Sequence, residues 1–176
     1  MVSRTCFAAE FISAIRARVG ADFPIILRWS QWKMQDYNAK LAPSPQALEE
    51  FLTPLIDAGV DIFHCSTRRF GRPEFDGSSL NLAGWTKKVS GKPTITVGSV
   101  GLNAGFVDEA RRDMVESAET NAASLDDLNE RLASNEFDLV AVGRALLQDP
   151  EWVVKVREGR FDELANYSKD VLKELY

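Results

Sequence analysis

Cysteine and histidine are scarce in this sequence, and their scarcity excludes several kinds of site. Cys6 and Cys65 are the only cysteines among 176 residues, too few for a disulfide framework, and they form no CxxC motif. This usage fits a protein of the reducing cytoplasm. His64 is the only histidine, so a zinc or di-iron centre would lack most of its preferred ligands, and no metal site is expected.

Long apolar runs and an excess of basic residues are also missing. No apolar run reaches the roughly 18 residues of a membrane span, and the start, MVSRTCFAAEF, lacks the apolar segment of a signal peptide. With 21 basic and 26 acidic side chains the net charge is −5, which argues against a nucleic-acid or anionic-membrane partner. A hydrophobic content of 45% without a break in composition predicts a single domain over residues 1–176.

Apolar residues at spacings of three and four predict amphipathic helices. The first such helix ends at Gly20 and carries on one face Phe7, Phe11, Ile12, Ile15 and Val19. Ser44 and Pro45 predict the N-cap and first residue of a second helix, which ends at Gly59. Further helices are expected over 104–116, after a capping box that begins at Ser124, after Asp149-Pro150, and over 162–176.

Four short apolar runs alternate with these helices and predict a parallel sheet. They are FPIILRWS (23–30), VDIFHC (60–65), PTITVG (93–98) and FDLVAVG (137–143). Strands buried on both faces give such nearly continuous runs, and right-handed crossovers place the helices outside. Residues 66–85, rich in turn formers, are expected to form a long functional or mobile loop.

Two neighbouring strand ends carry the pattern of a phosphate site. The third run continues as VGSVG (97–101), and the fourth ends as VGR (142–144). Glycine lets backbone N–H groups approach an anion closely, and a guanidinium adds a charge-assisted pair of donors. Because ligands of parallel α/β sheets lie at the carboxyl ends of strands, the pair favours a phosphate. The alternative is that both glycines only permit tight turns.

Other candidate residues have two interpretations each. Arg28 shares a strand face with Ile26 and Ser30, where either a ligand or an internal carboxylate would pair it. A lone histidine in the position of His64 is more often a hydrogen-bonded core residue than a catalyst. Cys65 is most simply a small apolar side chain that fills space in the core. Three loop arginines either attract an anionic substrate or are simply solvated: Arg68, Arg69 and Arg72. Three tryptophans either line a pocket or pack in the core: Trp29, Trp32 and Trp85.

Four segments together resemble the old yellow enzyme family of FMN-dependent oxidoreductases, and more closely its NADH:flavin oxidoreductase branch. They are AIRARVGADFPIILRWSQWK, AGVDIFHCSTRRF, KPTITVGSVGL and FDLVAVGRALLQDPEW. The resemblance implies an α/β fold, the C-terminal half of a (β/α)8 TIM barrel, with the four runs as strands five to eight and helices outside.

The resemblance also implies a flavin site and a reaction. Matching the motifs residue by residue gives as FMN-binding residues Arg28, Val97, Gly98, Ser99, Val142, Gly143 and Arg144. Arg28 matches the arginine that contacts the flavin ring near N1 and the C2 carbonyl, and the glycine motifs match the two phosphate loops. The implied activity is that of an ene-reductase, in which NAD(P)H is the hydride donor and the activated C=C bond of an α,β-unsaturated carbonyl is reduced.

The family's first four strands have no counterpart in the sequence. In the family, those strands carry the glutamine that faces the flavin, the His/Asn or His/His pair that orients the substrate carbonyl, and the tyrosine that donates a proton. No residue here matches them, so no catalytic residue is predicted. A truncated, non-catalytic paralogue or half-barrel binding module is the alternative. A barrel aldolase or isomerase would need a lysine or carboxylate at a strand end. Because an open half-barrel exposes sheet edges, we expect self-association or a complementary N-terminal half as partner.

Overall fold

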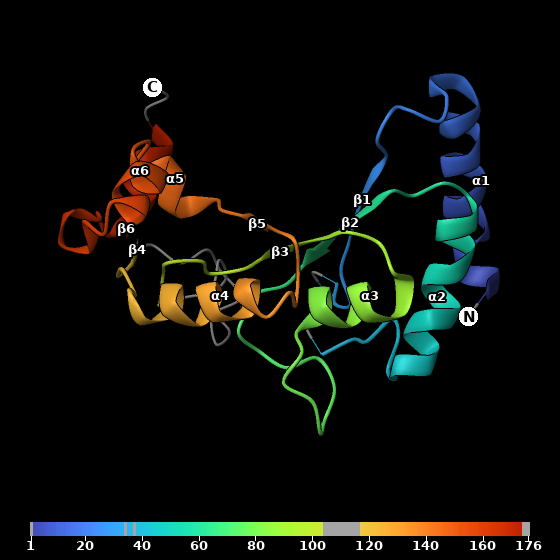
Figure 1. Cartoon of the computed structure of the whole chain (residues 1–176), viewed down its shortest axis with the longest axis horizontal. Coiled ribbons are helices and arrows are strands. Elements are labelled where there is room, and N and C mark those ends of the chain that lie inside the picture. The colour runs from blue at the N-terminus through green and yellow to red at the C-terminus, as the bar shows by residue number, and fades with distance from the viewer. Residues whose placement is uncertain (1, 34, 37, 104–116, 174–176) are drawn as a thin grey trace.

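The four apolar runs form the strands of one parallel sheet. The computed structural model describes residues 2–33, 35–36, 38–103 and 117–173, and the strands in this part of the chain follow the order β1-β2-β3-β5 (Figure 1). Their bounds are β1 Ile26–Trp29, β2 Ile62–Ser66, β3 Thr94–Val97 and β5 Leu139–Ala141. β1 and β3 begin only after Pro24 and Pro93, which have no N–H to donate to a ladder.

Helices connect the strands and cover one face of the sheet. The α-helices of the described residues are α1 Val2–Val19, α2 Pro45–Asp57, α3 Leu82–Ser90, α4 Ala123–Ala133, α5 Arg144–Gln148 and α6 Trp152–Arg157. Figure 1 shows α3 and α4 on one side of the strands, with α1 and α2 at one end and α5 and α6 at the other. None of the described helices has the length and apolarity that a bilayer crossing requires.

Side-chain alternation divides the sheet into a buried and an open face. Toward the helices, Phe63 is fully buried and the ring of Trp29 lies 5.2 Å from that of Phe51 on α2. On the opposite face, Ile26 and Leu139 are each 52% exposed although both are apolar. The open face and the two edge strands, β1 and β5, are the features that the sequence predicted for half of a barrel.

The two N-terminal helices lie where the sequence predicted them, but α1 buries a different set of side chains than expected. The predicted N-cap of α2 is confirmed, since the Ser44 hydroxyl accepts a hydrogen bond of 3.1 Å from the Ala47 N–H. The expected apolar face of α1 is right at Ile12, which is buried, but wrong at Phe7 and Phe11, which are 81% and 60% exposed. The buried stripe runs through Thr5 and Ile12, which are seven residues apart and so share a face against α2.

Helix α3 begins at Leu82, within the stretch 66–85 that the turn-forming residues predicted to be a loop. Asn81 begins it, because its side-chain oxygen accepts a hydrogen bond of 2.9 Å from the Gly84 N–H. Gly91 ends it in the left-handed region, with φ of 65°. Both are ordinary start and stop signals, and the turn-rich residues that precede Asn81 concealed them.

Helix α4 begins at Ala123, so the predicted capping box at Ser124 is wrong. Asn121 supplies the acceptors there: its carbonyl oxygen bonds to the Ser124 hydroxyl at 2.8 Å, and its side-chain oxygen to the Ser124 N–H at 3.3 Å. An acceptor two residues before the helix leaves Ser124 inside it. The helix expected over 104–116 lies outside the described residues.

The helix predicted over 162–176 is also wrong in the described part of this range. The chain forms two short 3-10 turns, Phe161–Glu163 and Lys169–Lys173, around strand β6, Tyr167–Ser168. β6 pairs antiparallel with β4, Ser117–Ala118, and Tyr167 is only 2% exposed. Burial of one large ring against a distant segment overrides the local preference for helix.

Candidate functional site

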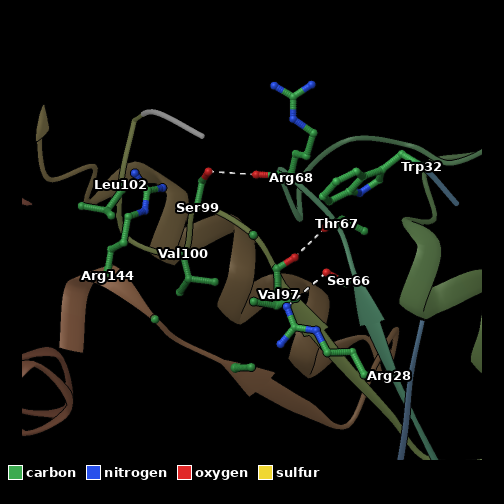
Figure 2. Close-up of a pocket in the computed structure, with 13 residues that line it drawn as sticks. Arg28, Trp32, Ser66, Thr67, Arg68, Val97, Ser99, Val100, Leu102 and Arg144 are labelled. Atoms are coloured by element: carbon green, nitrogen blue, oxygen red, sulfur yellow. Dashed lines mark hydrogen bonds between the residues drawn. The ribbon is translucent and has the colours of Figure 1, made fainter. Parts of the chain in front are cut away.

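A pocket of about 240 Å³ lies at the carboxyl ends of the strands. Among its lining residues are six of the seven predicted cofactor-binding residues: Arg28, Val97, Gly98, Ser99, Gly143 and Arg144 (Figure 2). The seventh, Val142, packs against the main hydrophobic core instead. Position at the strand ends thus gathers residues that are more than 110 positions apart in the chain, as Arg28 and Arg144 are.

The loop after β3 is held tightly by the segment that follows β2. Gly98 has a φ of 131°, and a Cβ built on it would lie 2.6 Å from the carbonyl oxygen of Thr67. Ser99 follows with a φ of 55°, and its hydroxyl donates a hydrogen bond of 2.9 Å to the Arg68 carbonyl. Close backbone approach therefore explains the glycine at position 98, as the tight-turn interpretation expected.

The end of β5 gives a different result for its glycine. A Cβ built on Gly143 would meet no atom within 4 Å, although the residue lines the pocket. Crowding within the protein therefore does not require glycine at this position. A Cβ there would take up space in the pocket, so Gly143 leaves a cradle of the kind that a bound anion uses to reach backbone N–H groups.

Arg144 is the first residue of α5 and lies at one end of the pocket (Figure 2). Its guanidinium carbon lies 5.3 Å from the centroid of the Tyr167 ring, in a cation–π contact. Burial lowers the pKa of Arg144 from its ordinary value, but a guanidinium stays charged in proteins. α5 has only five residues, so the cation, more than a helix dipole, supplies the positive charge.

Arg28 lies at the other end of the pocket, on the open face of the sheet (Figure 2). One of its terminal nitrogens donates a hydrogen bond of 3.1 Å to the Ser66 hydroxyl. No carboxylate of the described residues forms an ion pair with it, so the internal salt bridge considered from the sequence is not found there. His64 is its neighbour across the sheet, and burial followed by the Arg28 charge lowers the pKa of this imidazole, which favours the neutral form.

The remaining sequence candidates lie in the core or at the rim. Burial raises the pKa of Cys65 to about 12, so this thiol is an inert apolar filler as predicted. Trp29 packs in the core, and Trp85 packs edge-on against Phe75 at 5.3 Å. Trp32 lines the pocket.

Sequence reasoning missed some of the lining. Ser66 ends the second strand and Thr67 follows it, so both could have been found by the rule that identified the other strand ends. Leu102 had no such signal, because its place in the pocket depends on the path of the loop after β3.

The charge of the pocket lining has one sign. The lining includes Arg28, Arg68 and Arg144, and among the described residues that line the pocket there is no aspartate or glutamate. Arginines at such a pocket can form charge-assisted hydrogen bonds with an anion. The arrangement of arginines, an open cradle and apolar lining residues such as Val97 and Leu102 suits an anionic ligand that also has an apolar part.

Comparison with known proteins finds relatives over nearly the whole chain. An NADH oxidase from Thermoanaerobacter brockii is 31% identical over 169 residues, which cover 92% of this chain and 22% of the relative. Among solved structures, histamine dehydrogenase from Rhizobium sp. 4-9 matches 92% of this chain with 20% of its own, at a TM-score of 0.57 and 19% identity. An old yellow enzyme, TcOYE in complex with pHBA, matches 90% of this chain with 35% of its own, at a TM-score of 0.58 and 11% identity.

These likenesses confirm the predicted fold, a partial (β/α)8 barrel with a parallel sheet and outer helices. The chain spans about a fifth of the length of the curated relative. No protein-family model matches the sequence.

Proposed function

Since this chain is related to the old yellow enzyme-like oxidoreductases, we propose that it is the FMN-holding half of an FMN-dependent NAD(P)H oxidoreductase. The observation that carries the proposal is a pocket at the strand ends that is lined by three arginines and has an open cradle at Gly143. The proposed activity of the whole protein is reduction of activated C=C bonds in α,β-unsaturated carbonyls. Bound FMN would supply the hydride chemistry between NAD(P)H and the alkene.

Each end of the pocket has its own role in this proposal. Arg144, with the backbone at Gly143 and at Gly98–Ser99, would hold the phosphate. Arg28 at the opposite end would lie near N1 and the C2 carbonyl of the ring, where a positive charge favours the reduced, anionic form. The hydrogen bond to the Ser66 hydroxyl limits the directions in which the Arg28 side chain can point.

A titration with FMN and with riboflavin tests the proposal. We expect the purified protein to bind FMN more tightly, because only FMN has the phosphate. Gly143→Ala should weaken FMN binding by about tenfold or more, since its methyl group would occupy the cradle, and should leave riboflavin binding nearly unchanged. Gly71→Ala, outside this pocket, is the control, because its Cβ would meet only the end of the Asp127 side chain, at 3.3 Å. Equal affinities of the parent protein for FMN and riboflavin would contradict a phosphate site.

A non-catalytic binding module is the second candidate, and one observation favours it. Among the described residues that line the pocket there is no histidine, tyrosine, lysine, aspartate or glutamate to transfer a proton to substrate. Turnover of 2-cyclohexenone with NADPH, measured on the FMN-loaded chain, separates the two candidates. Turnover supports an enzyme, and FMN binding without turnover supports a module that needs another half for catalysis.

We also propose that the open sheet face is covered by a partner, either another copy of the chain or a complementary N-terminal half. Ile26 and Leu139 are each 52% exposed on this face, beside unpaired strand edges. We expect the chain to elute from size exclusion above its 19.6 kDa mass at micromolar concentration. Leu139→Glu should shift it toward the monomer, whereas Val153→Glu, at an exposed position on α6, should not. A stable monomeric parent protein would argue against the proposal.

A further inference from the structure

We infer that Tyr167 is the positioning residue for Arg144 and makes the pocket select a phosphorylated ligand. The inference rests on the proposed FMN site and adds a residue to it that lies outside the pocket lining. Its basis is the contact between the Arg144 guanidinium and the Tyr167 ring, 5.3 Å from carbon to centroid.

Tyr167 is itself held in place. It is only 2% exposed and packs in a small cluster with Leu102 and Ala118. Its backbone pairs with Ala118 across the two-stranded sheet of β4 and β6. A ring fixed by both its side chain and its backbone offers the guanidinium a rigid surface.

Helix α5 is attached to β6 at two points one turn apart. Arg144 contacts Tyr167, and four residues later the side-chain oxygen of Gln148 accepts a hydrogen bond of 2.9 Å from the Ser168 N–H. Residues four apart share one face of a helix, so both contacts fix the same face against the same strand. The start of α5, and with it Arg144, is therefore oriented by β6.

The Tyr167 cluster is continuous with the pocket. Leu102 belongs to both, since it packs against Tyr167 and also lines the pocket that Arg144 lines. An arginine side chain has many rotamers, and fixing one of them opposes binding. The contact with the Tyr167 ring restricts the Arg144 side chain before the ligand arrives, which lowers the entropy loss on binding. The planar guanidinium can then donate two parallel hydrogen bonds to a phosphate.

A tyrosine that only fills space would have a different effect. Its loss would loosen the small sheet and weaken binding of any flavin. A positioning role instead requires the electron-rich face of the ring, and its loss would weaken binding only of the ligand that carries the phosphate.

The test compares FMN with riboflavin in variants at position 167. Tyr167→Phe keeps the ring face, so we expect the parent ratio of the two dissociation constants. Tyr167→Leu removes the ring, and we expect FMN affinity to fall about five- to thirtyfold while riboflavin affinity stays unchanged. Pentafluorophenylalanine at position 167 keeps the ring shape but reverses the charge of its face, so it should resemble Tyr167→Leu even if that variant folds poorly.

The outcomes distinguish this inference from the proposed function. If the parent protein prefers FMN and Arg144→Ala abolishes that preference, while the fluorinated ring keeps it, Tyr167 is only structural and the inference is overturned. If the fluorinated ring weakens FMN and riboflavin binding equally, the inference is overturned as well. If the parent protein shows no preference for FMN, the proposed phosphate site is contradicted, and the inference that rests on it is overturned too.

Discussion

Arg144→Ala is expected to weaken FMN binding by about ten- to hundredfold, because a hydrogen bond to a charged group contributes roughly 1.5–3 kcal/mol. Arg144 lines the pocket beside the open cradle at Gly143, where its guanidinium can donate hydrogen bonds to a phosphate. Riboflavin affinity should change little, since the ring would lie toward Arg28. Fluorescence titration of both flavins measures the two constants on the same samples.

Two variants control for charge and geometry. Arg157→Ala removes a cation whose side chain is 73% exposed on α6, outside the pocket lining, and should leave FMN affinity unchanged. Arg144→Lys keeps the charge but loses the planar fork, so it should recover only part of the affinity. Identical FMN dissociation constants for Arg144→Ala and the parent protein would show that Arg144 does not take part in the proposed phosphate site.

Gly98→Ala is expected to lower the free energy of unfolding by about 3 kcal/mol or more, the range of a severe backbone clash. The added Cβ would lie 2.6 Å from the Thr67 carbonyl oxygen and 2.9 Å from the Arg69 backbone nitrogen, at a φ of 131°. Both neighbours are backbone atoms, which cannot move aside as the end of a flexible side chain can. Urea denaturation followed by circular dichroism measures the loss.

Gly143→Ala is the matched comparison for stability. Its Cβ would have no atom within 4 Å, so crowding should not reduce the free energy of unfolding. The pair therefore separates a glycine that the fold requires from one that the ligand requires. A Gly98→Ala protein as stable as its parent would mean that the backbone after β2 yields easily, and the tight packing of the two loops would be wrong.

Much of the fold could be predicted because its signals are local. The proline positions, the Ser44 cap and the four apolar runs each depend on neighbours in the chain, and each appears in the structure. Alternation along β1 placed Arg28 on the face of Ile26, and in the structure both side chains are exposed on the same face, since side chains point to opposite faces in turn. The strand-end rule then brought Arg28 and Arg144 to one pocket.

The errors come from interactions between distant segments. A stretch that would form a C-terminal helix by itself instead gives β6, because the Tyr167 ring is buried beside Leu102 and Ala118. The apolar face expected of α1 stays exposed at Phe7 and Phe11, because that helix packs on α2 through a stripe that includes Ile12 and Thr5. Periodicity shows which residues share a face, but it does not show which face meets a neighbour.

The sequence by itself determined the alternation of strands and helices, the apolar strands and the two glycine motifs at their ends, since these follow from backbone preferences and side-chain spacing. Only the tertiary structure decided that Gly98 and Gly143 differ. One is pressed against the backbone that follows β2 and the other faces open space, and such distances are set by how separate strands pack. For the same reason, the contact of Arg144 with Tyr167, 23 positions along the chain, became visible only in the folded protein.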